Sequence, residues 1–202
     1  MELVCLGLEG VLVPEIWCAV AEKTGIMELK RTTRDEPDYE KLIAWRMDIL
    51  RSHGLTLSDI QDTISQIHPL EGAYEFLSKL RSITQVVILS DTFKEFASPL
   101  MKQLGWPTIL CNSLVIDENN MLCGMKLRQV DGKRKAIEGF RSMGFRTFAA
   151  GDSYNDLSMI HTADKGCLFR APENILKEEP DLKLCTTYDE FYSVIESFVK
   201  ED

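Results

Sequence analysis

The sequence lacks the features of a secreted, membrane-embedded or nucleic-acid-binding protein. Its six cysteines are scattered and form no Cys-x-x-Cys pair, which argues against a disulfide framework or a zinc site. No apolar run approaches the length of a membrane span, and Glu2 and Glu9 interrupt the apolar N-terminal stretch, unlike a signal peptide. The formal net charge is −9, and the longest basic run is Lys133-Arg134-Lys135, so nucleic acid and membrane surfaces are disfavoured as partners. We expect a cytoplasmic protein.

What the chain does contain is enough for one substantial hydrophobic core. It has 202 residues, of which 45% are apolar and 27% charged, values typical of a soluble globular protein. Such a length leaves room for one domain with a small insertion. Small anionic molecules remain candidate ligands, because a metal ion or a few cations can make the electrostatic potential inside a single cleft positive.

Apolar strands and amphipathic helices alternate from about residue 70 onward, which predicts a doubly wound α/β fold with a parallel sheet. Strands are predicted at Glu2–Leu8, Gln85–Leu89, Thr108–Cys111, Thr147–Ala150 and Gly166–Phe169, and a hairpin joins Leu114–Ile116 to Met121–Leu127 around Asp117-Glu118-Asn119-Asn120. Helices are predicted from Pro14 to Gly25, over Tyr39–His53, Leu57–Ile67 and Leu70–Leu80, up to Gly105, and over Lys133–Met143, Leu157–Thr162, Pro172–Lys177 and Tyr188–Val199.

Residues 14–68 have helical patterns and no strand, apart from a polar loop at Arg31–Pro37. They interrupt the fold between its first strand and the rest. We therefore predict a helical cap at 14–68 over the carboxyl edge of the sheet, and a core made of residues 1–13 and 69–202.

The stretch Arg146–Asp156 carries the densest polar pattern. A short strand ends in Gly151, Asp152 and Asp156 follow four residues apart, and Asn155 lies where a helix could begin. The carboxyl edge of a parallel sheet is where open α/β folds bind ligands, and Mg²⁺ takes carboxylate oxygens together with substrate phosphate. The alternative is that Asp152 and Asn155 only cap the next helix.

Three other loops should meet this stretch at the same edge: Gly7-Leu8-Glu9-Gly10, Ser90-Asp91-Thr92, and the helix start at Lys133. A hydroxyl group and backbone N–H groups bind phosphoryl oxygens, a lysine neutralises their charge, and a metal held by carboxylates polarises them. Taken singly, Ser90 could be a helix cap and Lys133 a solvated cation. Their joint occurrence after successive strands favours phosphate chemistry.

The order and spacing of these motifs resemble the haloacid dehalogenase (HAD) superfamily of phosphotransferases, whose fold is a Rossmann-like parallel sheet flanked by helices. The segments Leu8–Trp17, Val87–Phe93 and Ala150–Asp156 resemble phosphoserine phosphatases of the ThrH type most specifically. That type also transfers the phosphoryl group from phosphoserine to homoserine. The resemblance covers essentially the whole chain, including Ala171-Pro172-Glu173-Asn174, and implies a small-molecule phosphate ester as substrate and Mg²⁺ as cofactor.

The resemblance also implies roles for particular positions. Residue 7 would be the nucleophile, and Glu9 would protonate the leaving oxygen and then activate water or an acceptor hydroxyl, while its backbone carbonyl binds Mg²⁺. Ser90, with Asp91 beside it, and Lys133 would hold the phosphoryl group.

The remaining positions would serve the metal and the amino-acid part of the substrate. Asp152 would bind the metal with Asp156 in support, and Asn155 would help to position the substrate. Glu15 would pair with the substrate ammonium and Arg46 with its carboxylate. Without the resemblance, Glu15 would be read as an acid favoured by the helix dipole and Arg46 as part of a solvated helix face.

The sequence departs from the family at the nucleophile, because position 7 is glycine instead of aspartate. Loss of a covalent nucleophile costs about 10⁶-fold in turnover, equivalent to about 8 kcal/mol, so the family mechanism predicts a nearly inactive chain. Gly7 can reflect an engineered inactivation, an error in the sequence or natural drift to a binding role; the intact remaining positions favour a recent or artificial change. A catalytically silent phosphoserine-binding protein and a phosphatase for another small ester are the alternatives. The oligomeric state, for example a homodimer, stays open.

Overall fold

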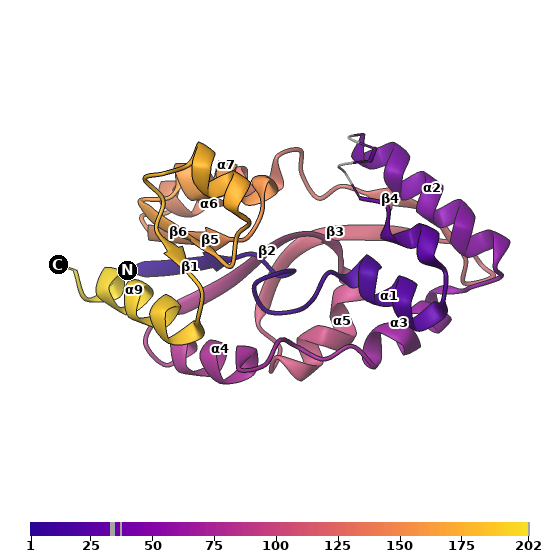
Figure 1. Cartoon of the computed structure of the whole chain (residues 1–202), viewed down its shortest axis with the longest axis horizontal. Coiled ribbons are helices and arrows are strands. Elements are labelled where there is room, and N and C mark those ends of the chain that lie inside the picture. The colour runs from indigo at the N-terminus through magenta and orange to yellow at the C-terminus, as the bar shows by residue number, and fades with distance from the viewer. Residues whose placement is uncertain (33–34, 37, 202) are drawn as a thin grey trace.

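The computed structural model describes residues 1–32, 35–36 and 38–201. Its described residues contain a seven-stranded sheet with the order β4-β3-β2-β1-β5-β6-β7, in which all neighbours pair in parallel except β3 and β4 (Figure 1). The strands are β1 (Glu2–Leu6), β2 (Gln85–Phe93), β3 (Thr108–Ile116), β4 (Leu122–Lys126), β5 (Arg146–Gly151), β6 (Lys165–Phe169) and β7 (Leu184–Cys185).

Helices cover both faces of this sheet. They are α1 (Ile16–Thr24), η1 (Met27–Lys30), α2 (Tyr39–Ser52), α3 (Leu57–Ser65), α4 (Ala73–Arg81), α5 (Lys94–Gln103), α6 (Gly132–Ser142), α7 (Tyr154–Thr162), α8 (Glu173–Glu178) and α9 (Tyr188–Lys200). In Figure 1, α4 and α9 lie on one side of the strands and α6 and α7 on the other. The predicted α/β fold with a parallel sheet flanked by helices is therefore confirmed.

The sequence of β1 is almost continuously apolar because both faces of this strand are buried. Val4 and Leu6 pack into the core on the α4 and α9 side, whereas Leu3 and Cys5 pack into the core on the α6 and α7 side. Side chains alternate between the faces of a strand, so a central parallel strand covered by helices on both faces needs apolar residues throughout. β1 ends at the carboxyl edge of the sheet, and Gly7 is the next residue.

Two predicted strands differ from the observed ones. The strand predicted at Gln85–Leu89 continues as β2 to Phe93, across an irregularity in its pairing with β3 between Leu89 and Phe93. Ser90 therefore lies in a strand and does not cap a helix. The strands predicted at Thr108–Cys111 and Leu114–Ile116 are one strand, β3, since the parallel pairing with β2 passes directly into antiparallel pairing with β4.

The end of β1 and the start of α1 both differ from the prediction. β1 ends at Leu6 rather than Leu8, because the chain then turns: the Gly10 N–H donates to the Val13 carbonyl, 2.8 Å. Pro14 is not the first helical residue. α1 begins at Ile16, whose N–H donates to the Glu9 carboxylate at 2.8 Å, and this hydrogen bond fixes the helix start.

Three further features differ from the sequence predictions or lie partly outside the described residues. The helix predicted from Leu70 begins at Ala73, after a residue with positive φ, Gly72. The two-residue strand β7 was not predicted, because two residues carry no periodicity. Of the loop predicted at Arg31–Pro37, residues 33, 34 and 37 lie outside the described part of the chain.

Residues 14–68, which we call the cap segment, contain α1, η1, α2 and α3, and these helices lie together at one end of the molecule (Figure 1). The hairpin of β3 and β4 reaches this segment. The Leu57 N–H donates to the Asn120 carbonyl at 2.8 Å, and Arg51 donates to the Leu122 carbonyl at 3.2 Å. Among the described residues, no helix is both long and apolar enough to cross a membrane.

Candidate active site

A cavity of about 380 Å³ opens where β1, β2 and β5 end and the cap segment begins. All ten residues singled out in the sequence line it, together with seven others. The ten are Gly7, Glu9, Glu15, Arg46, Ser90, Asp91, Lys133, Asp152, Asn155 and Asp156. The carboxyl ends of parallel strands meet at one edge, and that geometry brings together residues spread over most of the chain.

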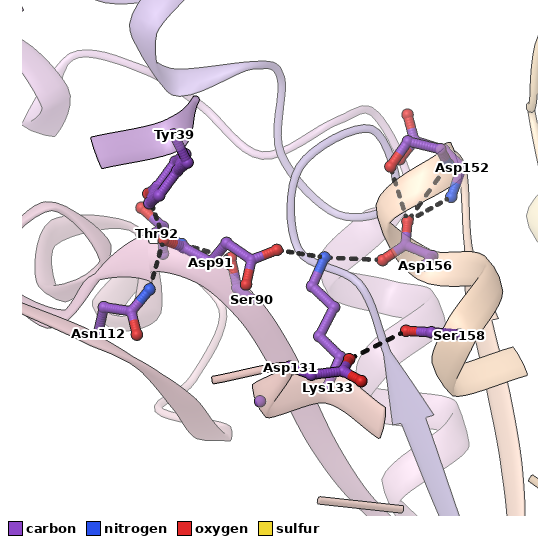
Figure 2. A network of polar contacts seen from close by, with 12 residues as sticks. Tyr39, Ser90, Asp91, Thr92, Asn112, Asp131, Lys133, Asp152, Asp156 and Ser158 are labelled. Carbon is purple, nitrogen blue, oxygen red and sulfur yellow. Dashed lines mark hydrogen bonds and ion pairs between the residues drawn. The ribbon is translucent and has the colours of Figure 1, made fainter. Parts of the chain in front are cut away.

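Lys133 lines this cavity and lies between two carboxylates (Figure 2). Its Nζ is 2.8 Å from Asp156 Oδ1 and 3.1 Å from Asp91 Oδ2, and its side chain is only 12% exposed. Burial alone would lower the pKa of Lys133, but the charges of Asp156 and Asp91 outweigh it and raise that pKa. Lys133 is thus a permanent cation inside the cavity and not a solvated surface lysine.

Asp156 is almost fully buried and organises the loop after β5. Its Oδ2 accepts hydrogen bonds from the Asp152 N–H at 3.0 Å and from the Ser153 N–H at 3.2 Å. Ser153 is the N-cap of α7, and Asp156 stands at the third helical position of that capping box. The cap of this helix is therefore Ser153, which leaves Asp152 and Asn155 out of the capping role considered from the sequence.

Asp152 contrasts with its neighbour, since in the described part of the chain its carboxylate forms no ion pair and no hydrogen bond to another residue. Burial, the negative charge of Asp156 and that of Glu15 raise the pKa of Asp152 to about 7. Gly10, at φ +72°, leaves space for this carboxylate, because any Cβ at position 10 would collide with it. A cation beside Asp152 would offset both the cost of burying its negative charge and the repulsion by Asp156 and Glu15.

Glu9 is held at the junction of core and cap segment. Its Oε1 accepts the Ile16 N–H, and burial, followed by the charge of Glu15, raises the pKa of Glu9 to about 7. The Ile16 hydrogen bond and the cations Lys133 and Arg46 lower it only in part. A carboxyl group with this pKa exchanges a proton near neutral pH, as a general acid and base must.

Gly7 occupies the end of the central strand, where its N–H donates to the Ala150 carbonyl at 2.9 Å. A Cβ at this position would lie 3.4 Å from Val11 Cγ2 and 3.5 Å from Asp156 Oδ1, which are ordinary or nearly ordinary contacts. Gly7 also lacks the positive φ that would favour glycine. The fold therefore accepts a side chain at position 7.

Figure 2 shows how Ser90 and Asp91 are fixed at the end of β2. Ser90 Oγ accepts the Thr92 N–H at 3.2 Å. The Asp91 carbonyl accepts hydrogen bonds from the Tyr39 hydroxyl at 2.9 Å and from the Asn112 amide at 3.0 Å. Tyr39 thus ties the cap segment to the core. The sequence analysis missed it, because an aromatic residue at a predicted helix start gives no sign of a distant partner.

Two of the residues proposed to bind the substrate, Glu15 and Arg46, come from the cap segment, whereas Asn155 comes from the core. Arg46 is 6% exposed, which contradicts the solvated helix face considered for it, and its guanidinium stacks 4.6 Å above the Trp17 ring. Glu15 is exposed and precedes α1 as its N-cap residue. Asn155 is exposed at the rim near the start of α7. Trp17, for which the sequence indicated no separate role, also lines the cavity.

The charges around the cavity bear on the expected Mg²⁺. Among the described residues, five acidic side chains line it, from Glu9, Glu15, Asp91, Asp152 and Asp156, against the two cations Arg46 and Lys133. Such a surplus repels a phosphate dianion unless a cation is added. In the described chain, however, no group of three or more Asp, Glu, His or Cys side chains is placed to hold a metal. Asp152 suits Mg²⁺, which is usually bound by one or two carboxylates together with substrate phosphate. A second carboxylate, which the family has at position 7, is missing here.

The fold and the cavity are those of a phosphatase of the HAD superfamily. A family model of haloacid dehalogenase-like hydrolases matches residues 23–161. The chain belongs to this family.

Particular relatives sharpen the comparison. The chain is 56% identical over 190 residues to the phosphoserine phosphatase ThrH of Pseudomonas aeruginosa, covering 94% of this chain and 93% of that protein. It is 55% identical over 190 residues to a phosphoserine phosphatase of Pseudomonas syringae pv. tomato, covering 94% of this chain and 80% of that protein. A phosphoserine phosphatase solved with substrate bound shares the fold, with a TM-score of 0.75 at 22% identity and 93% of each chain covered.

Proposed function

We propose that this protein has the binding site of a Mg²⁺-dependent phosphoserine phosphatase that can also transfer the phosphoryl group to homoserine, and that Gly7 leaves it nearly inactive. One observation carries the proposal: a largely buried lysine and a buried arginine line one cavity, the lysine from the core and the arginine from the cap segment. Two separated cations suit a ligand with two separated anionic groups. The two curated relatives above half identity are both named phosphoserine phosphatases, which supports the same ligand.

The two ends of phosphoserine match the two ends of the cavity. Lys133 would meet the phosphoryl oxygens, with the hydroxyl of Ser90 beside it at the end of β2. Arg46 in the cap segment would donate hydrogen bonds to the substrate carboxylate, and Glu15 would pair with the ammonium. Asp91 and Asn155 complete the walls of the cavity between these ends. We propose accordingly that residues 14–68 act as a cap that reads the amino-acid part of the substrate.

For catalysis, a carboxylate at position 7 would attack phosphorus, and the serine oxygen would leave with a proton from Glu9. The position of Glu9 supports this role, because the residue lines the cavity and its Oε1 is held by the Ile16 N–H. Glu9 would then take a proton from water, for hydrolysis, or from the homoserine hydroxyl, for transfer. Gly7 offers no such nucleophile.

Mg²⁺ would be held by the Asp152 carboxylate and the backbone carbonyl of Glu9, with Asp156 fixing the loop around Asp152. When bound, it supplies a charge that offsets the phosphoryl oxygens. The free carboxylate of Asp152, with its pKa near 7, supports a cation at this place. The six cysteines are all free, which fits the reducing cytoplasm that we propose as its location.

The decisive test is to supply the missing carboxylate. We expect Gly7→Asp to release phosphate from phosphoserine in the presence of Mg²⁺ at least about 10⁴-fold faster than the unaltered chain, given what a nucleophile contributes. Gly7→Asn, which has the same shape without a nucleophilic carboxylate, is the matched control and should stay inactive. Equal rates for Gly7→Asp and Gly7→Asn would refute the proposed hydrolysis. Adding homoserine and measuring phosphohomoserine then tests transfer separately.

A second candidate function is phosphoserine binding without turnover, and Gly7 itself favours it. Calorimetry on the unaltered chain, with and without Mg²⁺, decides whether the ligand binds. Absence of binding under both conditions would eliminate this role. If the unaltered chain binds phosphoserine and the Gly7→Asp variant hydrolyses it, the site is a phosphoserine phosphatase site that only binds its ligand when residue 7 is glycine.

A further inference from the structure

Arg46 is an unusually placed cation. It is buried, and in the described chain no carboxylate lies within ion-pair distance of its guanidinium. One Nη2–H donates to the Arg31 carbonyl at 2.7 Å, whereas Nε is buried and has no hydrogen-bond partner among the described residues. A buried guanidinium with unused donors is costly unless an anion reaches it.

The flat face of this guanidinium rests on Trp17, with 4.6 Å between Arg46 Cζ and the ring centre. Trp17 in turn packs edge-on against Phe96, with ring centres 5.2 Å apart, and Phe96 packs edge-on against Phe93 at 5.7 Å. Phe93 is the last residue of β2, three positions after Ser90. A continuous row of rings therefore connects Arg46 in α2, through α1 and α5, to the strand that carries Ser90.

This stacking determines which donors of Arg46 are available. A guanidinium donates in its own plane, so a ring against its face leaves the donating edges open and holds their orientation. One edge is partly occupied by the Arg31 carbonyl. The donors that the Arg31 carbonyl leaves unused lie in the same plane, and pairs of coplanar guanidinium donors are what a carboxylate accepts in a bidentate way. Without the ring, the flexible side chain would sample other orientations.

We propose that Trp17 is a positioning residue that makes the site specific for phosphate esters carrying a carboxylate, by holding Arg46 toward the cavity. The inference rests on the proposed function, because it takes Arg46 as the group that meets the substrate carboxylate. It predicts that Trp17 affects phosphoserine but not phosphoethanolamine, which is the same ester without the carboxylate. It also predicts a graded effect, since tryptophan attracts cations more strongly than phenylalanine does and leucine lacks an aromatic face.

The test uses the unaltered chain with Gly7, in which binding can be measured without turnover. Calorimetry in Mg²⁺ buffer compares phosphoserine with phosphoethanolamine for the parent, Trp17→Phe and Trp17→Leu. We expect phosphoserine affinity to fall in that order, by about 3- to 30-fold for Trp17→Leu, with phosphoethanolamine affinity unchanged. The constant phosphoethanolamine affinity is also the control for folding. A loss of equal size for both esters, or no loss for either, would overturn the positioning role.

A double-substitution cycle separates action through Arg46 from a general packing effect. In an Arg46→Gln background, Trp17→Leu should no longer change the ratio of the two affinities. An unchanged effect of Trp17→Leu in that background would show that Trp17 acts without Arg46 and would refute the inference. In the Gly7→Asp enzyme, Trp17→Leu should raise KM for phosphoserine with little change in kcat. An active Gly7→Asp enzyme without this KM effect refutes only the role of Trp17, whereas inactivity of Gly7→Asp refutes the proposed function.

Discussion

Lys133 Nζ lies 2.8 Å from Asp156 Oδ1, and both side chains are almost fully buried. This pair joins the first turn of α6 to the first turn of α7, at the edge of the sheet where residue 7 lies. The same lysine also reaches the more exposed Asp91 at 3.1 Å. We expect a ligand anion in the cavity to meet this oriented cation and to displace Asp91, the more exposed of its two partners, while Asp156 stays in place.

The first prediction concerns this pair. Lys133→Met should abolish binding of inorganic phosphate and lower the free energy of unfolding by about 3–5 kcal/mol, because it leaves Asp156 charged and buried without a cation. Calorimetry and denaturant unfolding measure the two effects. Adding Asp156→Asn to Lys133→Met should recover part of the stability but no phosphate binding. Phosphate binding by Lys133→Met would contradict the assignment of this lysine.

The second prediction concerns the space reserved for Asp152. Gly10→Ala should destabilise the protein by more than the cost of about 1–2 kcal/mol for placing alanine at positive φ, since its Cβ would also displace the Asp152 carboxylate. Gly25→Ala is the matched control, because Gly25 has φ +75° and no atoms within 4 Å of its Cβ. Only Gly10→Ala should weaken Mg²⁺ binding. Equal melting temperatures and equal Mg²⁺ affinities for the two variants would argue against the close approach.

The third prediction concerns metal binding. Gly7→Asp should bind Mg²⁺ about tenfold more tightly or better in the absence of phosphate, because it adds a second carboxylate beside Asp152. Gly7→Asn tests whether the charge is required. Chelation with EDTA should abolish phosphate release by Gly7→Asp, and added Mg²⁺ should restore it. Hydrolysis that persists after chelation would rule out the proposed metal dependence.

The fourth prediction concerns pH and stability at the start of β5. Burial raises the pKa of Asp164, but hydrogen bonds from Thr147 and the charge of Arg141 outweigh it and lower that pKa in the folded protein. Asp164 therefore adds stability above its unfolded pKa of about 4, and this contribution is lost as the pH falls through the lower folded value.

Asp164→Ala should accordingly cost about 2 kcal/mol at pH 7, from charged hydrogen bonds, and lower the melting temperature by about 4–8 °C. The difference from the parent should shrink steadily as the pH falls below about 4. Asp48→Ala, which removes an exposed ion pair to Arg51, should change little at either pH. A difference that is independent of pH would contradict the role of the Asp164 charge.

Several features of the site could be predicted from short stretches of sequence. Apolar runs located β1, β2 and β5, and the polar residues that follow such runs fall at the same sheet edge, which is why Glu9, Ser90 and Asp152 line one cavity. The boundaries were less accurate where long-range contacts decide them. Ser90 lies in β2 because pairing with β3 continues past Leu89, and no local pattern reveals that continuation.

By itself, the sequence determined the alternation of strands and helices, the order of the polar loops and the absence of a carboxylate at position 7, since these depend only on residue type and spacing. Only the tertiary structure decided which charges are buried and what they face. It placed Trp17 under Arg46 and Tyr39 on the Asp91 carbonyl, and it put Lys133 between two carboxylates. Charge states and hydrogen bonds depend on distance and on exclusion of water, and folding sets both between residues far apart in the chain.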